Sequence, residues 1–331
     1  MDRADYILRD GYAPPRRLDG NDEMTLDTLG IHDWGVVTLY RRPREVIDVG
    51  LVVDMNDAKM GKMAENVWLS ALDACGCKGI GDPGLEAISR CEQLTWLDVS
   101  YTSITGKGVA SLSVLPRLET FTAIKCGLLD DSAGEALSKM ESLTAINLSY
   151  CSQLTSKCIK PFDELPSLKS VHLMRCDNMF QTFKRRNGDV GDYAMDALRN
   201  CPVLETINIS QSRNVNDRSI INLVCGEVNL DEYEGEGRPS SLTRLDISYC
   251  SETTDESLHA ITMLPALTSL DCAWTPHVTD DGVALLANKI KTLVHLNVGG
   301  CSKVTKAKRE AIAKAKGEKF TLCAVDAPKF Q

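Results

Sequence analysis

One nine-residue pattern recurs along the chain and constrains its fold more than any other feature. An aliphatic residue is followed by two variable residues, an apolar residue, one variable residue, an apolar residue, two variable residues and often a cysteine. Clear copies occupy residues 143–151, 168–176 and 242–250. Nine copies begin at Leu69, Leu94, Leu118, Leu143, Leu168, Leu204, Leu242, Leu267 and Leu293. Most steps between copies are 24 to 26 residues, and a fixed period of this length indicates a repeat protein.

A second signature follows the nine-residue pattern and is typical of a helix start. An apolar residue precedes Thr, Asn or Gly, which precedes Asp, as at residues 80–88, 215–223 and 278–286. The small polar residue can cap a helix, and the acidic residue is stabilised at the positive helix end. Apolar residues three apart then supply one buried face. Each repeat is therefore predicted to contain a short strand, a turn, a helix and a return.

The combined signatures resemble the cysteine-containing leucine-rich repeat family, known from the substrate-receptor part of F-box proteins. The resemblance covers residues 67 to about 316 and implies an α/β leucine-rich repeat solenoid, or horseshoe, of about nine repeats. In that family a parallel sheet lines the concave side and helices line the convex side. We predict an extended N-terminal arm over 1–45, an N-terminal cap over 46–66, repeats over 67–316, and a C-terminal cap strand and tail over 317–331. Insertions at 178–189 and 226–239 lengthen two repeats, and no F-box is visible.

Six of the thirteen cysteines share one position of the repeat. The ninth pattern position is expected to turn inward, where a small, weakly polar side chain can meet backbone groups. It holds Cys77, Thr102, Cys126, Cys151, Cys176, Ser212, Cys250, Thr275 and Cys301. The first twenty residues carry Asp2, Asp5, Asp10 and Asp19 and lack an apolar run, unlike a signal peptide. Free thiols in a reducing, cytoplasmic setting are therefore expected, with an organelle or cytoskeletal particle as the alternative.

Charge and hydropathy exclude two classes of partner. The net charge is −9, whereas a general nucleic-acid binder needs cations to displace phosphate counterions, so direct nucleic-acid binding is not expected. No stretch approaches the length of about eighteen apolar residues that a membrane helix needs, so no membrane insertion is expected.

Three motifs suggest chemistry, and each has a simpler interpretation. Residues 79–84 match GxGxxG, but other repeats place a helix start there without the glycines. Cys75 and Cys77 form a CxC pair without two further zinc ligands nearby in sequence. His172 and His295 are predicted on the concave face without a neighbouring nucleophile. We therefore expect no enzyme activity, no cofactor and no metal.

The concave face is the predicted binding site for one or more protein partners. Alternate strand residues face opposite sides of a sheet, and large aromatic residues and arginine recur at the position before the cysteine column. Such residues dominate the hot spots of protein interfaces. An alternative is that this ladder packs structurally and that the Asp and Asn residues between the strand apolar positions bond neighbouring repeats. The predicted binding residues are Trp96, Tyr101, Tyr150, His172, Arg175, Tyr249 and Trp274, with Phe180, Phe183 and Arg185 from the aromatic and basic first insertion.

Three functions fit these features. The first is a non-enzymatic scaffold or adaptor that binds a protein through its concave face and arm. The second is a structural subunit of a large assembly, such as a flagellar, ribosomal or membrane complex. The third, implied by the resemblance, is the substrate receptor of a ubiquitin ligase. The arm has few apolar residues and contains Pro14-Pro15, so it is expected to become ordered along the repeats or a partner. The alternative is an autonomous helical cap on the first repeat.

Overall fold

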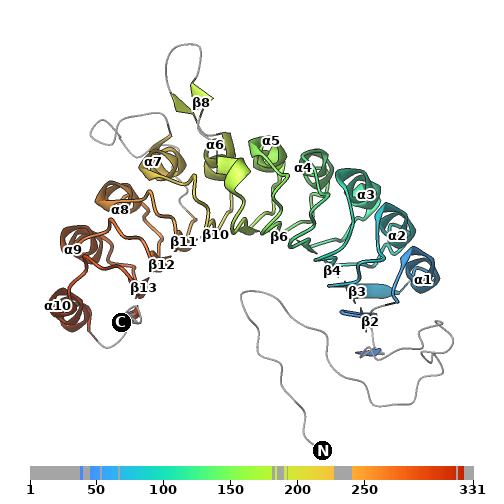
Figure 1. The fold of residues 1–331 in the computed structure, drawn as a ribbon, viewed down its shortest axis with the longest axis horizontal. Helices are drawn as coiled ribbons and strands as arrows, with labels where there is room; N and C mark the ends of the chain where they lie inside the picture. Colours follow the sequence, from blue (N-terminus) through green and yellow to red (C-terminus); the bar gives the residue numbers. More distant parts are fainter. Residues whose placement is uncertain are drawn as a thin grey trace, which may run out of the picture. The chain divides into compact units, whose positions relative to one another are not determined.

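Short parallel strands alternate with helices throughout the repeats of the computed structural model (Figure 1). The structure describes residues 38–39, 45–52, 54–65, 68–180, 183–184, 190–191, 193–226, 241–317 and 320–323. The chain divides into two units, Met1–Leu148 and Ser149–Gln331. Nearly all of the predicted arm and of the second insertion lies outside the described residues.

The first unit contains one sheet whose strand order follows the chain, β1-β2-β3-β4-β5-β6. Strands β1 and β2 are antiparallel, and the later neighbours are parallel. The strands are β1 Thr38–Leu39, β2 Glu45–Asp48, β3 Leu69–Asp73, β4 Trp96–Asp98, β5 Thr120–Thr122 and β6 Ala145–Asn147. The helices are α1 Asp57–Met63, α2 Asp82–Ile88, α3 Gly106–Ser111, the 3₁₀ helix η1 Leu112–Val114 and α4 Ser132–Leu137.

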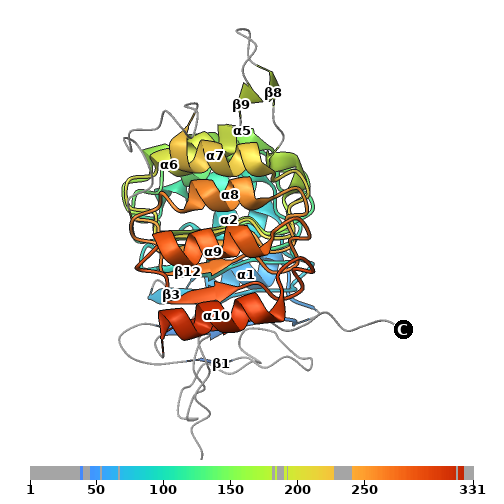
Figure 2. The ribbon, with the colours of Figure 1, turned by 90° about the vertical axis from the view of Figure 1, so that its left-hand side faces the viewer.

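The second unit has an all-parallel sheet in the order β7-β10-β11-β12-β13-β14. Its strands are β7 Ser170–His172, β10 Thr206–Asn208, β11 Arg244–Asp246, β12 Ser269–Asp271, β13 His295–Asn297 and β14 Thr321–Cys323. Its helices are α5 Ser156–Ile159, η2 Lys160–Glu164, η3 Asp177–Phe180, α6 Tyr193–Asn200, α7 Asp217–Cys225, α8 Asp255–Ile261, α9 Asp280–Lys289 and α10 Lys306–Lys316. Helices α8, α9 and α10 run side by side in both views (Figures 1 and 2).

A small antiparallel hairpin interrupts the second unit at the first insertion. Strand β8 Phe183–Lys184 pairs with β9 Val190–Gly191. Both ribbon views show the hairpin projecting away from the helices (Figures 1 and 2). The insertion therefore lies on the helical side of the unit.

The strands pair in register, which places equivalent residues of successive repeats side by side. Leu97 pairs with Phe121 in the first unit, and Leu270 pairs with Leu296 in the second. These central strand residues are buried, while their neighbours on either side are mostly half exposed. The core therefore lies between the sheet and the helices. This parallel arrangement is that of an α/β leucine-rich repeat fold, and the predicted fold class is confirmed.

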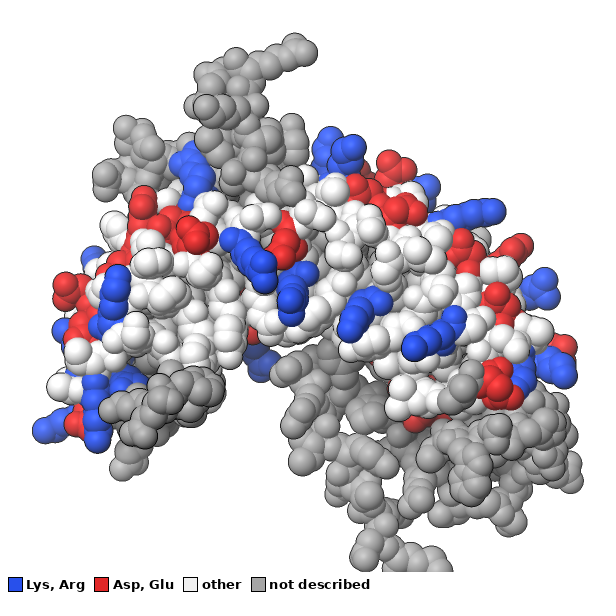
Figure 3. Space-filling view, viewed as in Figure 1, with Lys and Arg blue, Asp and Glu red and all other residues white. Residues whose placement is uncertain are grey.

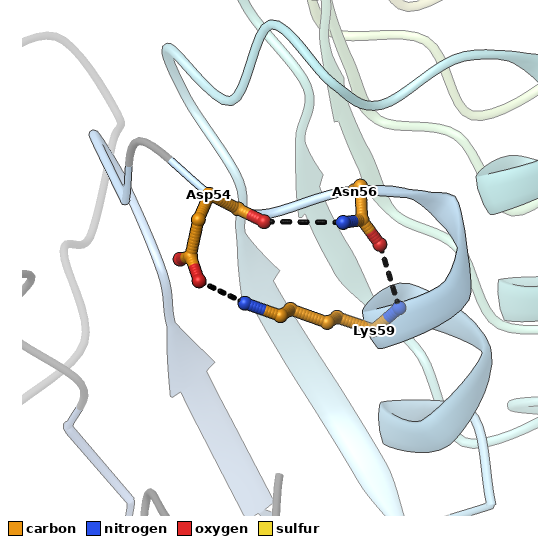
Figure 4. Close-up of polar contacts among 3 residues, drawn as sticks. All are labelled: Asp54, Asn56 and Lys59. Atoms are coloured by element: carbon orange, nitrogen blue, oxygen red, sulfur yellow. Dashed lines mark hydrogen bonds and ion pairs between the residues drawn. The ribbon is translucent and has the colours of Figure 1, made fainter. Parts of the chain in front are cut away.

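The expected capping residues occur at the helix starts. Thr254 Oγ1 accepts from the Glu256 amide at 3.1 Å, and Thr279 Oγ1 accepts from the Asp281 amide at 3.2 Å. At α1 the cap is Asn56, whose Oδ1 accepts from the Lys59 amide at 3.2 Å (Figure 4). The Lys59 ammonium in turn pairs with the Asp54 carboxylate.

In several repeats an aspartate follows the cap and bonds the next repeat. Asp255 accepts from the Thr279 amide at 2.9 Å and from its hydroxyl at 2.5 Å. Asp82 makes the same pair of bonds to Thr105, at 2.8 and 2.7 Å. This contact gives a helix-side hydrogen bond between neighbouring repeats, in addition to the strand pairing.

The segment predicted to be an N-terminal cap, 46–66, contains most of the strand and all of the helix of a further repeat. Strand β2 is parallel to β3, and helix α1 follows it. Ile47 and Val49 are fully buried at the two inner strand positions.

Among the described residues, no helix combines the length and the hydropathy needed to cross a membrane.

Candidate protein-interaction face

One position in each repeat has a left-handed backbone, and it is the position before the cysteine column. Every described non-glycine residue with positive φ occupies it: Leu51, Tyr101, Lys125, Tyr150, Arg175, Gln211, Tyr249 and Trp274, with φ between 55° and 64°. Gly76 and Gly300 occupy it in two further repeats, with φ of 80° and 72°. We call this set the left-handed ladder.

The left-handed ladder continues the backbone pairing of the sheet. The Tyr249 amide donates to the Ala273 carbonyl at 2.8 Å, and the Trp274 amide donates to the Gly299 carbonyl at 2.7 Å. A left-handed conformation costs an L-residue roughly 1–2 kcal/mol, a cost that glycine escapes. Each bulky ladder residue is thus held in a conformation that glycine would adopt more readily.

In the first unit the ladder presents an aromatic ring beside a cation. Tyr101 is 46% exposed, and the Lys125 ammonium lies 5.5 Å from the centroid of its ring. Trp96, at the first position of β4, is half exposed, but its indole Nε1 is buried and has no hydrogen-bond partner.

In the second unit the ladder forms two clusters. The Arg175 guanidinium lies 5.9 Å from the centroid of the Tyr150 ring, and the Tyr150 hydroxyl donates to Gln211 Oε1 at 3.2 Å. Tyr249 and Trp274 stack with ring centroids 5.6 Å apart and an interplanar angle of 10°. They are 49% and 38% exposed, respectively. These clusters place large side chains in fixed orientations, as a protein-binding hot spot requires.

The Asp and Asn column stabilises the turn that leads into the ladder. The Asp246 carboxylate accepts from the Ser248 amide at 2.9 Å, and Asn297 Oδ1 accepts from the Gly299 amide at 3.0 Å. Asn208 Nδ2 also donates to Asp246 Oδ2 at 3.0 Å. These contacts support the structural interpretation of the column. His172 is the residue of this column on β7. It is half exposed, and its Nε2 lies 3.0 Å from the Ser170 hydroxyl oxygen.

The cysteine column lies inward and bonds the backbone, as predicted. Cys77 is fully buried, and its thiol donates to the Val49 carbonyl at 3.0 Å. Thr102, which replaces cysteine in one repeat, donates to the Val99 carbonyl at 2.6 Å. All thirteen cysteines are free in the structure.

The first insertion departs from its predicted role. Phe180 is fully buried in η3, so the prediction that it contacts a partner is wrong. The adjacent Met179 fills the core position that Leu154 fills in the preceding repeat. Phe183 lies in β8, and Arg185 falls outside the described residues.

The glycines of the GxGxxG match serve packing between repeats. A Cβ on Gly84 would lie 2.7 Å from Asp57 Oδ1, and one on Gly79 would lie 2.5 Å from the Met55 carbonyl oxygen. The Asp57 carboxylate accepts from the Gly81 and Gly84 amides at 2.8 and 3.0 Å.

Within the described ranges, no group of three or more His, Cys, Asp and Glu residues is arranged to hold a metal ion.

Figure 3 shows lysine, arginine, aspartate and glutamate side chains interspersed on one face of the molecule. Acidic and basic side chains alternate along its helical edge. On the coloured part of that face neither sign forms a continuous patch. The coloured part of this face therefore has no single-sign patch that would attract a charged polymer over a long range.

Comparison with protein-family models found no match, and comparison with curated proteins found none. Among solved structures, a crystal structure of the Rad7 and Elc1 complex in yeast matches with 16% identity and a TM-score of 0.37, covering 81% of this chain and 83% of that chain. An internalin, InlF, from Listeria monocytogenes matches with 13% identity and a TM-score of 0.44, covering 86% and 87%. At these values the similarity carries no argument about function. The sheet topology and repeat pairing define the class of this chain, an α/β leucine-rich repeat protein.

Proposed function

We propose that this protein is a non-enzymatic interaction scaffold that binds a protein partner through the open sheet face and the left-handed ladder. One observation carries the proposal. Tyr101, Tyr249 and Trp274 are large, exposed aromatic residues held in a backbone conformation that favours glycine. Strained positions persist where function retains them. Gly76 and Gly300 indicate that the fold itself accepts glycine there.

The proposed contact residues on this face are Trp96, Tyr101, Tyr150, His172, Arg175, Tyr249 and Trp274. Their mixture of aromatic rings and cations matches the composition of interface hot spots. The stacked rings of Tyr249 and Trp274 in neighbouring repeats suit an extended or helical partner segment. We further propose that the repeats are of the cysteine-containing type and that the protein works in a reducing, cytoplasmic compartment.

Affinity purification of the tagged full-length protein, followed by mass spectrometry, tests this function. A scaffold should recover one stoichiometric client, and Tyr249→Gly combined with Trp274→Gly should reduce its recovery. A set of many stoichiometric subunits would indicate a structural subunit of a large assembly. Recovery of a ubiquitin-ligase scaffold protein would indicate that the chain is the substrate receptor of such a ligase. Recovery unchanged by the double substitution would contradict the proposed face.

A further inference from the structure

Three aspartates form a continuous column on the open sheet face of the first unit. Asp48 pairs in register with Asp73, and Asp73 pairs with Asp98, on the parallel strands β2, β3 and β4. In-register neighbours lie about 4.8 Å apart, so the three carboxylates span roughly 10 Å. All three residues are half exposed. We call them the aspartate column.

Each carboxylate uses one oxygen for the local turn. Oδ1 of Asp48, Asp73 and Asp98 accepts from the amide two residues later, at 2.9, 2.9 and 2.8 Å. No lysine or arginine in the described part of the chain forms an ion pair with any of the three. The three carboxyl groups are therefore stacked without a cation from the described residues.

The second unit shows that the turn does not need this charge. Asn208 and Asn297 make the same turn with an amide oxygen, at 3.0 Å in each case. Their Nδ2 groups also donate to the neighbouring carboxylates of Asp246 and Asp271, at 3.0 and 2.8 Å. In the second unit the column carboxylates thus accept hydrogen bonds from neighbouring asparagine amides, whereas Asp48, Asp73 and Asp98 have no asparagine beside them in the column.

An unsatisfied hydroxyl lies next to the aspartate column. Thr122 pairs in register with Asp98, so both side chains arise from the same face of the sheet. Thr122 is fully buried, and its Oγ1 has no hydrogen-bond partner. Buried polar groups without partners are rare in folded proteins and call for an explanation. The Thr122 hydroxyl is therefore a further unsatisfied polar group next to Asp98 in the sheet.

We propose that the aspartate column binds a basic segment of a partner protein, which presents lysine or arginine side chains to Asp73 and Asp98. A basic segment supplies the missing cations. A column about 10 Å long accommodates two such side chains, because side chains on one face of a helix or strand are about 6–7 Å apart. Burial raises the pKa of both Asp73 and Asp98, as expected for carboxylates without a cation. The inference rests on the proposed function and specifies the chemistry of the partner.

Fluorescence anisotropy with labelled 15-residue peptides on the full-length protein tests this inference. The probes are a Lys/Ala peptide, an Arg/Ala peptide and a Glu/Ala peptide. The test variant carries Asp73→Asn and Asp98→Asn, which preserve an amide oxygen for the turn. The control variant carries Asp246→Asn and Asp271→Asn, which remove the same net charge from the equivalent column of the second unit.

The basic peptides should bind the wild-type protein and the control variant with similar affinity. They should bind the test variant about tenfold more weakly, as expected for loss of a close charge pair. The Glu/Ala peptide should not bind. Equal affinity for the two variants, or stoichiometric binding of Ca²⁺ or Mg²⁺ alone to the column, would overturn the inference. If the basic peptides do not bind but the Tyr249 and Trp274 substitutions reduce client recovery, this inference fails and the proposed function stands.

Discussion

The Trp274 indole stacks on the Tyr249 ring and also covers Gly300 in the next repeat. A Cβ on Gly300 would lie 2.5 Å from Trp274 Cδ2, and Gly300 has a φ of 72°. The stack, with its centroids 5.6 Å apart, therefore depends on a glycine in the following repeat. Residues of three successive repeats are matched at this point of the ladder.

Gly300→Ala should destabilise the protein by about 1–2 kcal/mol, because alanine is strained at positive φ. The new methyl group should also displace Trp274. Near-ultraviolet circular dichroism and urea unfolding would detect the two effects. An unchanged aromatic spectrum would show that Trp274 does not depend on Gly300. Gly127→Ala is a matched control, since a Cβ there meets no heavy atom within 4 Å.

Gly282→Ala tests the hydrogen bond between helix starts. Gly282 lies in the first turn of α9, where alanine normally stabilises a helix relative to glycine. Its Cβ would, however, lie 2.1 Å from Asp255 Oδ1, the atom that accepts from the Thr279 amide. We expect a loss of about 1–3 kcal/mol in the free energy of unfolding, the size of a disrupted buried hydrogen bond. A gain in stability would mean that helix propensity dominates and the inter-repeat bond is unimportant.

Asp73→Asn should change how stability depends on pH. Burial raises the pKa of the Asp73 carboxyl to about 7 from its ordinary 3.8; the Asp98 and Asp48 charges raise it and the Cys75 amide lowers it. Between these two values the native carboxyl keeps a proton that the unfolded chain has lost, so native stability falls as pH rises. Burial raises the pKa of the Cys75 thiol to about 12 and that of the Cys77 thiol to about 11, and the Asp73 charge contributes to both increases.

The Asp73→Asn variant should therefore be more stable than the wild-type protein by about 1–3 kcal/mol near pH 8, and by about nothing near pH 4. Urea unfolding at several pH values measures the difference. A difference independent of pH would contradict the raised pKa. A stabilising substitution at this position would also fit a residue retained for binding at the expense of stability.

Native alkylation should distinguish two cysteines from the other eleven. Cys323 is exposed and Cys75 half exposed, whereas the remaining cysteines are buried. Iodoacetamide should modify Cys323 first and Cys75 slowly, because burial raises the pKa of the Cys75 thiol to about 12. After denaturation all thirteen should react, as counted by mass spectrometry. Two or more unreactive pairs would indicate disulfides and would refute the expectation of free thiols.

The period of the sequence was sufficient to predict the fold, the buried cysteine column and the helix caps. It missed the repeat that begins with β2, because Arg44 and Val52 stand where other copies have leucine and cysteine. That repeat is recognised from the structure, in which Ile47 pairs in register with Leu72.

The ladder was identified as a set of large residues, but its left-handed backbone was not. Gly76 and Gly300 in the same column were the available signal. Phe180 was misassigned because the start of an insertion was read as a loop, whereas η3 continues the core for one turn. The unpaired carboxylates of the aspartate column could not be predicted from sequence, since compensation depends on which side chains are in register.

The measurement that tests the account most directly is the affinity of the recovered partner for ladder variants. Tyr249→Gly and Trp274→Gly should each weaken binding by about 1–4 kcal/mol, the range of interface hot spots. Neither substitution should lower the free energy of unfolding by more than about 1 kcal/mol relative to the wild-type protein, and either could raise it, since glycine relieves the left-handed strain. Val114→Ala and Leu128→Ala alter residues that are not part of the ladder and are 68% and 60% exposed, and they should not change affinity. If both ladder variants bind as tightly as these controls, the left-handed ladder is not the interaction surface.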